Sequence, residues 1–371
     1  MEFKEYRFDE VTINFDKKRV PLSSTQRKRI QGEYRYYGAQ GVIDHINDFI
    51  FDGTYLLIAE DGENLKSKKQ DIAQVVDGQF WVNNHAHIVQ GNELCDTRYL
   101  CYLLNSMDLS GYITGSAQPK LSQSNLNAVS VFLPPITIQK EIVEYLYILD
   151  KKIAVNIAIN DNLEQQASAL FSSFYDRSNT EVRYTDLIQI LGGGTPKTGE
   201  NTYWNGNIAF FTPKDVGTPY TLITEKTITE EGLSHCNSRL YPVNTVFVTA
   251  RGTVGKVGMS GVPMAMNQSC YALVGKETHQ LLVYFYTLKA VDRLKHKASG
   301  AVFDAITTRD FESEQIMKLS DDDAKEFLCI AEPMFQKVLN NCIENLRLST
   351  LRDSLLPKLM SGEVDVSAVQ L

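Results

Sequence analysis

The most regular pattern of apolar positions lies in the middle of the chain, between residues 136 and 174. Apolar or amide side chains recur there at alternating steps of three and four: Leu146, Leu149, Ile153, Asn156, Asn160, Leu163, Ala167, Leu170 and Phe174. This spacing is typical of a coiled-coil seam, in which a polar residue such as Asn sets the register. Because no Gly or Pro interrupts it, the segment predicts a helix of roughly 60 Å. An ordinary helix with one core-facing stripe is the alternative.

A second helical pattern covers residues 322–356 and is expected to end at Pro357. Its stripe is less regular: Phe335, Val338, Cys342, Leu346, Leu351 and Leu355. Neither helix has a core of its own, so the simplest arrangement is an antiparallel pair in which the two stripes bury each other.

The segments before each helix have a different pattern, with short β-branched and aromatic runs separated by Gly, Asn, Asp and Pro. Tyr55–Ala59 and residues 79–82 are such runs in the first half, and residues 208–211 and 245–249 in the second. The halves also resemble each other. Val82-Asn-Asn-His-Ala-His aligns with Met266-Asn-Gln-Ser-Cys-Tyr, and Thr114-Gly-Ser-Ala aligns with Ala298-Ser-Gly-Ala, at separations of about half the chain.

These patterns predict an α+β protein with a pseudo-two-fold internal repeat. Two β-rich domains, residues 1–135 and 176–318, are separated by two long antiparallel helices, residues 136–175 and 319–371, that form a coiled coil. A length of 371 residues fits two domains with connecting elements.

Composition narrows the class of protein. With 43% hydrophobic and 22% charged residues the chain is typical of a globular protein, and a net charge of −8 argues against a purely electrostatic nucleic-acid binder. The apolar runs are far shorter than a membrane span, and the start shows no secretory signal. The six cysteines form no CxxC motif, so we expect reduced thiols in a cytoplasmic protein.

Candidate catalytic motifs are incomplete. Gly194 and Gly199 have the spacing of a phosphate-binding loop, but Glu200 and Asn201 stand where Lys and Ser or Thr are needed. A turn with positive φ and close backbone approach explains these glycines better. A nuclease pattern begins at Asp52 and Glu60 but has Gly62 in place of the required lysine. An adenine-methyltransferase loop is absent as well.

Two histidines, His85 and His87, alternate along an expected strand and so should point the same way. A surface or core pair is a better explanation for them than a metal site, because no carboxylate stands at ligand spacing. The lack of a complete catalytic set favours a binding protein.

Basic clusters on probable loops are the remaining signal, since loops are where a β-rich domain reaches phosphates and base edges. The candidate DNA-binding residues of the first domain are Arg27, Arg29, Lys66, Lys69, Gln118 and Lys120, and those of the second are Lys197, Lys214, Arg251 and Lys256. Arg and Gln pair with guanine and adenine edges, whereas Lys more often contacts phosphate.

The whole chain resembles the specificity (S) subunit of type I restriction–modification systems. The motifs that carry the resemblance are Leu133-Pro-Pro-Ile-Thr-Ile-Gln at the first helix, Gly193-Gly-Thr-Pro-Lys and Thr212-Pro-Lys-Asp in the second domain, Tyr36-Tyr-Gly-Ala-Gln-Gly in the first, and Leu351-Arg-Asp-Ser-Leu-Leu-Pro-Lys-Leu near the end. The second helix departs from the pattern, because Leu319-Ser-Asp-Asp-Asp replaces the Pro-Pro start, which leaves its first residue open.

The resemblance implies two target-recognition domains that each read one part of an asymmetric, split site in double-stranded DNA. It also implies a non-catalytic chain that recruits two modification subunits, which bring S-adenosylmethionine, and restriction subunits, which bring ATP and Mg²⁺. No cofactor or metal is expected on this chain, and its location would be the prokaryotic cytoplasm. Two readers on one side of a duplex should be about one helical turn, 10–10.5 bp, apart.

Two other hypotheses remain. A coiled-coil scaffold for protein partners shares the fold but predicts no salt-dependent affinity for duplex DNA. An enzyme with an unrecognised site, such as a nuclease, predicts metal-dependent cleavage by the isolated chain.

Overall fold

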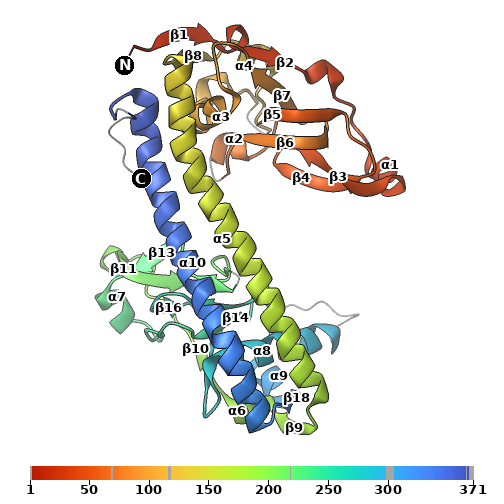
Figure 1. Cartoon of the computed structure of the whole chain (residues 1–371). Helices are drawn as coiled ribbons and strands as arrows, with labels where there is room; N and C mark the ends of the chain where they lie inside the picture. The colour runs from red at the N-terminus through yellow and green to blue at the C-terminus, as the bar shows by residue number, and fades with distance from the viewer. Residues whose placement is uncertain are drawn as a thin grey trace. The chain divides into compact units, whose positions relative to one another are not determined.

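The computed structural model describes residues 2–67, 70–115, 118–217, 219–297, 305–364 and 366. The chain divides into two compact units (Figure 1). Unit 1 contains Met1–Lys151 and Leu348–Leu371, and unit 2 contains Lys152–Arg347. Two long helices, α5 (Ile136–Arg177) and α10 (Asp321–Ser361), each contribute one part to unit 1 and the other part to unit 2.

Unit 1 is built on a six-stranded sheet with the order β2-β7-β5-β6-β3-β4 and on a small sheet of β1 and β8. Its strands are β1 (Lys4–Arg7), β2 (Thr12–Asn14), β3 (Gln31–Gly38), β4 (Gly41–Ile46), β5 (Phe51–Ala59), β6 (Ala73–Val82), β7 (Ala86–Gly91) and β8 (Ser130–Leu133). Its short helices are η1 (Phe8–Glu10), η2 (Asp16–Lys18), α1 (Ser24–Arg29), α2 (Asn64–Ser67), α3 (Thr97–Ser106), η3 (Ser110–Tyr112) and α4 (Gln123–Asn127).

The core of unit 1 forms where α3 covers one face of this sheet. Leu56 and Ile58 of β5 point toward the helix residues Tyr99 and Leu103, all of them buried. The period-two pattern of β5 explains the opposite face, where Leu57 packs in a separate cluster with Phe51 and Phe80. The rings of Phe51 and Phe80 stack with their centroids 5.4 Å apart.

Unit 2 repeats the same plan with its sheet split into two parts, ordered β10-β17-β14-β15-β12 and β13-β11-β16, beside a small sheet of β9 and β18. Its strands are β9 (Thr180–Arg183), β10 (Ile188–Gly192), β11 (Trp204–Phe211), β12 (Tyr220–Thr221), β13 (Lys226–Ile228), β14 (Val246–Thr249), β15 (Val257–Ser260), β16 (Met264–Met266), β17 (Cys270–Gly275) and β18 (Gln315–Lys318). Its helices are α6 (Tyr184–Leu187), η4 (Asn201–Tyr203), α7 (Glu230–Ser234), α8 (Gln280–Lys297) and α9 (Thr308–Ser313).

The split in unit 2 has a local cause. In unit 1 the single strand β6 pairs with both β5 and β3. In unit 2 two strands take its place: β15 pairs with β14, and β16 pairs with β11. Residues 261–263 between them end in Pro263, which has no N–H group for a central ladder.

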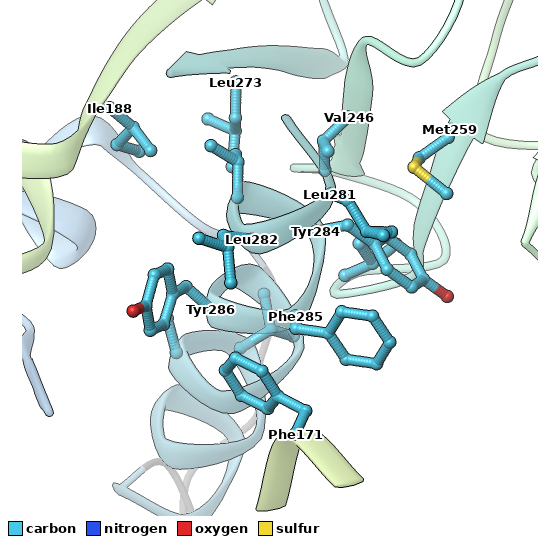
Figure 2. Packing of buried hydrophobic residues seen from close by; sticks show 14 of the residues in the cluster. Phe171, Ile188, Val246, Met259, Leu273, Leu281, Leu282, Tyr284, Phe285 and Tyr286 are labelled. Atoms are coloured by element: carbon cyan, nitrogen blue, oxygen red, sulfur yellow. The ribbon is translucent and has the colours of Figure 1, made fainter. Parts of the chain in front are cut away.

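Helix α8 supplies more buried side chains to the main core cluster of unit 2 than any other element (Figure 2). Leu281, Leu282 and Phe285 project from it between the sheet residues Leu273 and Val246 and the side chain of Phe171 from α5. The rings of Phe171 and Phe285 stack at 5.0 Å. The C-terminal part of α5 is therefore held by domain packing as well as by α10.

The predicted seam of α5 is confirmed. Leu146, Leu149, Ala167 and Phe174 are buried, and so are the two seam amides. In unit 2, Asn160 Oδ1 accepts a 2.8 Å hydrogen bond from Asn341 Nδ2 of α10. Asn156 Nδ2 donates at 2.8 Å to Glu344 and to Asn345.

Because residue numbers rise along α5 as their partners' numbers fall along α10, the helices are antiparallel in unit 2. In unit 1, Arg352 donates to Asp150 at 2.7 Å across the same pair of helices.

The second helix differs from its prediction in two places. It begins at Asp321 and continues through Pro357 to Ser361, so the predicted end at Pro357 is wrong. The lost backbone hydrogen bond is tolerated because the turn after the proline buries Leu359 and Met360 in the core of unit 1. Leu351, predicted in the stripe, is 44% exposed.

The internal repeat is confirmed at the level of single backbone hydrogen bonds. The amide of Asn83 donates to Tyr37 O in unit 1, and the amide of Asn267 donates to Phe211 O in unit 2. The two aligned asparagines also make the same turn, since Asn83 Oδ1 accepts from His85 N at 2.8 Å and Asn267 Oδ1 accepts from Ser269 N at 3.0 Å. The second aligned pair cannot be compared, because residues 298–301 lie outside the described residues.

Two smaller expectations need correction. His87 lies in β7 and is buried, but His85 precedes the strand and its side chain is 51% exposed, so the two do not share an environment. Gly193 does make a close approach, because a Cβ there would lie 2.3 Å from Asn267 O, yet neither Gly193 nor Gly194 has a positive φ. None of the helices in the described part of the chain has the length and hydrophobicity of a membrane span.

Candidate nucleic-acid interface

Four loops meet at one end of the large sheet of unit 1, and we call them loop cluster 1: residues 38–41, 60–67, 83–85 and 114–121, of which 116 and 117 lie outside the described residues. Backbone hydrogen bonds join three of these loops, and Gln40 Nε2 of the 38–41 loop donates to Asn64 Oδ1 at 3.2 Å. Glu60 N donates to His85 O at 2.9 Å, and Leu121 N donates to Glu60 O at 2.8 Å. The 114–121 loop is closed at its base by two bonds between Thr114 and Lys120.

A buried charge network lies beneath loop cluster 1. His87 is 1% exposed, and its Nδ1 lies 2.6 Å from Asp16 Oδ2 while its Nε2 lies 2.8 Å from Leu121 O. Arg19 Nη1 donates to Glu60 Oε2 at 3.0 Å, and Lys120 Nζ lies 3.2 Å from Glu60 Oε1. The network therefore joins η2, the end of β5, β7 and the 114–121 loop.

The carboxylates of this network are ionised. Burial alone raises the pKa of Asp16, but hydrogen bonds from His87 and from the Ile88 amide outweigh it, so the net pKa is lower than usual. Burial also opposes ionisation of Glu60, and the hydrogen bond from Arg19 leads the groups that lower its pKa overall.

Three of the predicted residues of unit 1 belong to loop cluster 1: Lys66, Gln118 and Lys120, all exposed as residues. Lys69 lies outside the described residues. Arg27 and Arg29 lie elsewhere, on α1, which adjoins the opposite end of β4 through the bond from Asn47 N to Ile30 O. The structure thus separates the two arginines from the other candidates of this unit.

Arg27 is committed to internal contacts. Its Nε donates to Asp44 at 2.9 Å, its Nη1 donates to Leu22 O at 2.7 Å, and its guanidinium lies 5.0 Å from the ring centroid of Tyr36. The ion pair is largely buried, with 17% and 22% of the two side chains exposed. These contacts support a structural role for Arg27, while the exposed Arg29 stays a prediction.

The equivalent loops of unit 2 form loop cluster 2: residues 193–200, 212–217, 250–256 and 267–269. Ala250 N donates to Ser269 O, Ile306 N donates to Ala250 O, and Thr253 Oγ1 donates to Pro213 O at 3.1 Å. Gly194 N donates to Met266 O, which ties the glycine-rich loop to the same end of the unit.

All four predicted residues of unit 2, Lys197, Lys214, Arg251 and Lys256, lie on loop cluster 2 and are exposed or partly exposed. Lys214 has an ion partner, Glu225, at 3.8 Å, but 81% of its side chain remains accessible. A Cβ at Gly255 would meet Lys295 Cε at 2.6 Å, so α8 brings a further cation beside the 250–256 loop.

The two loop clusters differ in charge at matched positions. The residue after Glu60 is Asp61, and the residue after the equivalent Ala250 is Arg251. Asp61 pairs with Lys120 and Arg251 with Ala305 in equivalent isolated bridges. In loop cluster 1 the acidic Glu60, Asp61 and Glu63 outnumber Lys66 and Lys120, whereas in loop cluster 2 the four predicted cations outnumber Glu200 and Asp215.

The other candidate groups are metal-ligating side chains and cysteine thiols. In the described part of the chain, no group of three His, Cys, Asp or Glu side chains is arranged to hold a metal ion. The six cysteines are free, and burial raises the pKa of the Cys95 and Cys270 thiols to about 12, which makes them unreactive.

The fold and these loops define a class: α+β proteins with an internal repeat, in which each sheet domain presents a polar loop surface and both domains are built onto a pair of long helices. The chain belongs to the family of type I restriction modification DNA specificity domains, whose model matches residues 1–165 and 177–318. The match covers both halves of the repeat.

Named relatives agree with this family. A Haemophilus influenzae protein named as a type I restriction enzyme specificity subunit is 34% identical over 138 residues, which are 37% of this chain and 35% of that protein. The chain thus spans about a third of the length of this relative. The HindI specificity subunit of the same organism is 23% identical and aligns over 84% of each chain.

Among solved structures, the S subunit of a type I restriction–modification system from M. genitalium has the same fold. It superposes with a TM-score of 0.66 at 12% identity and covers 97% of this chain and 96% of its own.

Proposed function

We propose that this chain is the DNA-reading, non-catalytic specificity subunit of a type I restriction–modification complex. Loop cluster 1 reads one part of an asymmetric split site in double-stranded DNA, and loop cluster 2 reads the other. Two modification subunits supply S-adenosylmethionine chemistry, and restriction subunits supply ATP-driven cleavage. The reduced thiols suit the prokaryotic cytoplasm.

The observation that carries the proposal is the repetition of one loop arrangement in both halves of a chain whose family model also matches both halves. Equivalent backbone bonds hold each cluster, while the side chains at equivalent positions differ, as Asp61 and Arg251 do. A shared scaffold with different contact residues is what two readers of unlike sequences require.

Co-expression with a cognate modification subunit, followed by mapping of methylated adenines on a plasmid, tests the proposal. Two short motifs at a fixed spacing are expected. Methylation without a split motif, or none that depends on this chain, would contradict it.

A matched pair of variants assigns the readers. Arg251→Ala should relax or weaken only the motif read by unit 2, and Lys120→Ala should affect only the motif read by unit 1. Equal effects of either substitution on both motifs would show that the loop clusters do not read separately.

A further inference from the structure

We propose that His87 is a positioning residue of the unit 1 reader, which in its doubly protonated form holds the 114–121 loop against the sheet for contact with DNA. The inference rests on the proposed function, and it adds a pH dependence that is confined to one of the two half-sites. It follows from the groups that face the imidazole ring.

Both ring nitrogens of His87 face oxygen atoms. Nε2 lies 2.8 Å from Leu121 O, and a backbone carbonyl only accepts hydrogen bonds, so Nε2 must carry a proton. Nδ1 lies 2.6 Å from Asp16 Oδ2, whose partner oxygen Oδ1 accepts from Ile88 N at 2.8 Å. A second proton must therefore lie between Nδ1 and Oδ2.

The second proton belongs on the imidazole. Arg19 Nη2 lies 3.4 Å from the same Asp16 oxygen, and the Glu60 carboxylate lies 4.0 Å from Nδ1, so the surroundings favour an ionised Asp16 beside a cationic ring. Lys120 balances Glu60 from the far side. The exposed His85 pairs with Asp61 at 2.8 Å and does not contact this ring in the described hydrogen bonds.

Loss of that proton leaves two acceptors facing each other in a buried site. Either Nε2 then faces Leu121 O without a hydrogen, or Nδ1 faces the Asp16 carboxylate without one. Because Leu121 N is already bonded to Glu60 O, the His87 bond is the second anchor of this residue, directly after the predicted contact residues Gln118 and Lys120. Removal of the proton should loosen the 114–121 loop.

Unit 2 provides an internal control. His87 pairs with Ile58 in the sheet of unit 1, and the equivalent pair in unit 2 is Tyr271 with Val248. Tyr271 has no imidazole ring and therefore cannot lose the proton that this proposal requires. The unit 2 half-site should therefore be bound without this pH dependence.

The first test uses the free full-length chain. Ring ¹⁵N and ¹³C spectra of histidine-labelled protein, assigned with His87→Tyr, should show both nitrogens of His87 protonated near neutral pH. Hydrogen exchange of 114–121, referenced to 305–308 in unit 2, should accelerate as the proton is lost. Spectra that show only one protonated nitrogen on His87 near neutral pH, or a loop whose relative exchange does not change when the proton is lost, overturn the proposal.

The second test measures DNA affinity with the modification subunits bound, once methylation mapping has given the site. The affinity ratio between the intact duplex and a duplex with the unit 1 half-site scrambled should fall about tenfold between a pH at which the spectra show both His87 nitrogens protonated and a pH at which they do not. Asp16→Asn should flatten this profile, because an amide can donate to a neutral Nδ1 while Nε2 still donates to Leu121. Tyr271→Phe should leave the profile unchanged.

The outcomes separate the two proposals. If no duplex is preferred at any pH, the proposed function fails, and the spectra and loop exchange still decide the role of His87. If both half-sites are read but the ratio stays constant with pH, the positioning role of His87 fails while the function stands.

Discussion

The buried amide pair between α5 and α10 offers a quantitative test of how the helices are held in unit 2. Asn160 and Asn341 are 6% and 1% exposed and share one hydrogen bond of 2.8 Å. Asn341 Oδ1 has no hydrogen-bond partner in the described part of the chain. The pair is thus only partly satisfied, in an interface that is otherwise largely apolar.

Asn160→Leu should lower the free energy of unfolding of unit 2 by about 1–3 kcal/mol, because it leaves both polar groups of the Asn341 amide buried and unpaired. The double variant Asn160→Leu/Asn341→Leu removes the unpaired groups of this amide pair and adds apolar contacts. It should recover the loss and equal or exceed the wild-type stability. The expected coupling energy is therefore favourable by at least about 1 kcal/mol.

Urea unfolding followed by tryptophan fluorescence can isolate unit 2, since Trp81 lies in unit 1 and Trp204 in unit 2. A Trp81→Phe background leaves Trp204 as the reporter. If the double variant loses the sum of the two single losses, the amides do not interact as a pair in a dry interface, and this reasoning is refuted.

Three further outcomes are expected. Arg27→Ala should lower the stability of unit 1 by about 1–2 kcal/mol, because it removes the Asp44 and Leu22 contacts, and should leave the methylated motif unchanged. Arg251→Ala should leave thermal unfolding unchanged and weaken DNA binding by about 1–3 kcal/mol. A changed motif for Arg27→Ala, or an unfolded Arg251→Ala variant, would contradict these assignments. Burial and the Asp161 carboxylate raise the pKa of Glu164 to about 7, above its unfolded value, so the stability of unit 2 should fall as pH rises from about 4.5 to about 7. Glu164→Gln should therefore stabilise unit 2 by about 1 kcal/mol at about pH 8 and not near pH 4. An equal gain at both pH values would argue against this cause. Pro357→Ala should raise the stability of unit 1 by about 1–3 kcal/mol in chemical denaturation, because it restores a backbone N–H inside α10 at an exposed position. A lower stability of the variant would mean that α10 needs the proline to keep its course.

Features that depend on residues near one another in the chain were predictable. The three-and-four spacing from Leu146 to Phe174 specifies which face of α5 is buried, and the seam amides Asn156 and Asn160 are paired as such positions require. The aligned segments at Val82 and Met266 revealed the repeat, because equivalent turns need equivalent local sequences. The loop positions of the basic residues of loop cluster 2 were predictable for the same reason, since each residue stands beside Gly or Pro.

Features that join distant segments were decided by the tertiary structure. The sequence does not show whether an arginine is free or paired with another side chain. Only the tertiary structure brings Asp44 and Tyr36 to Arg27, and these contacts support a structural role for it. Helix α10 passes Pro357 because Leu359 reaches the core of unit 1, and packing outweighs the local cost. His87 contacts oxygen atoms of Asp16 and Leu121, which lie 71 and 34 residues away along the chain. The spacing of apolar residues indicates which local structure a segment prefers. The contacts and charge state of a side chain depend instead on which other groups the fold brings within hydrogen-bond distance.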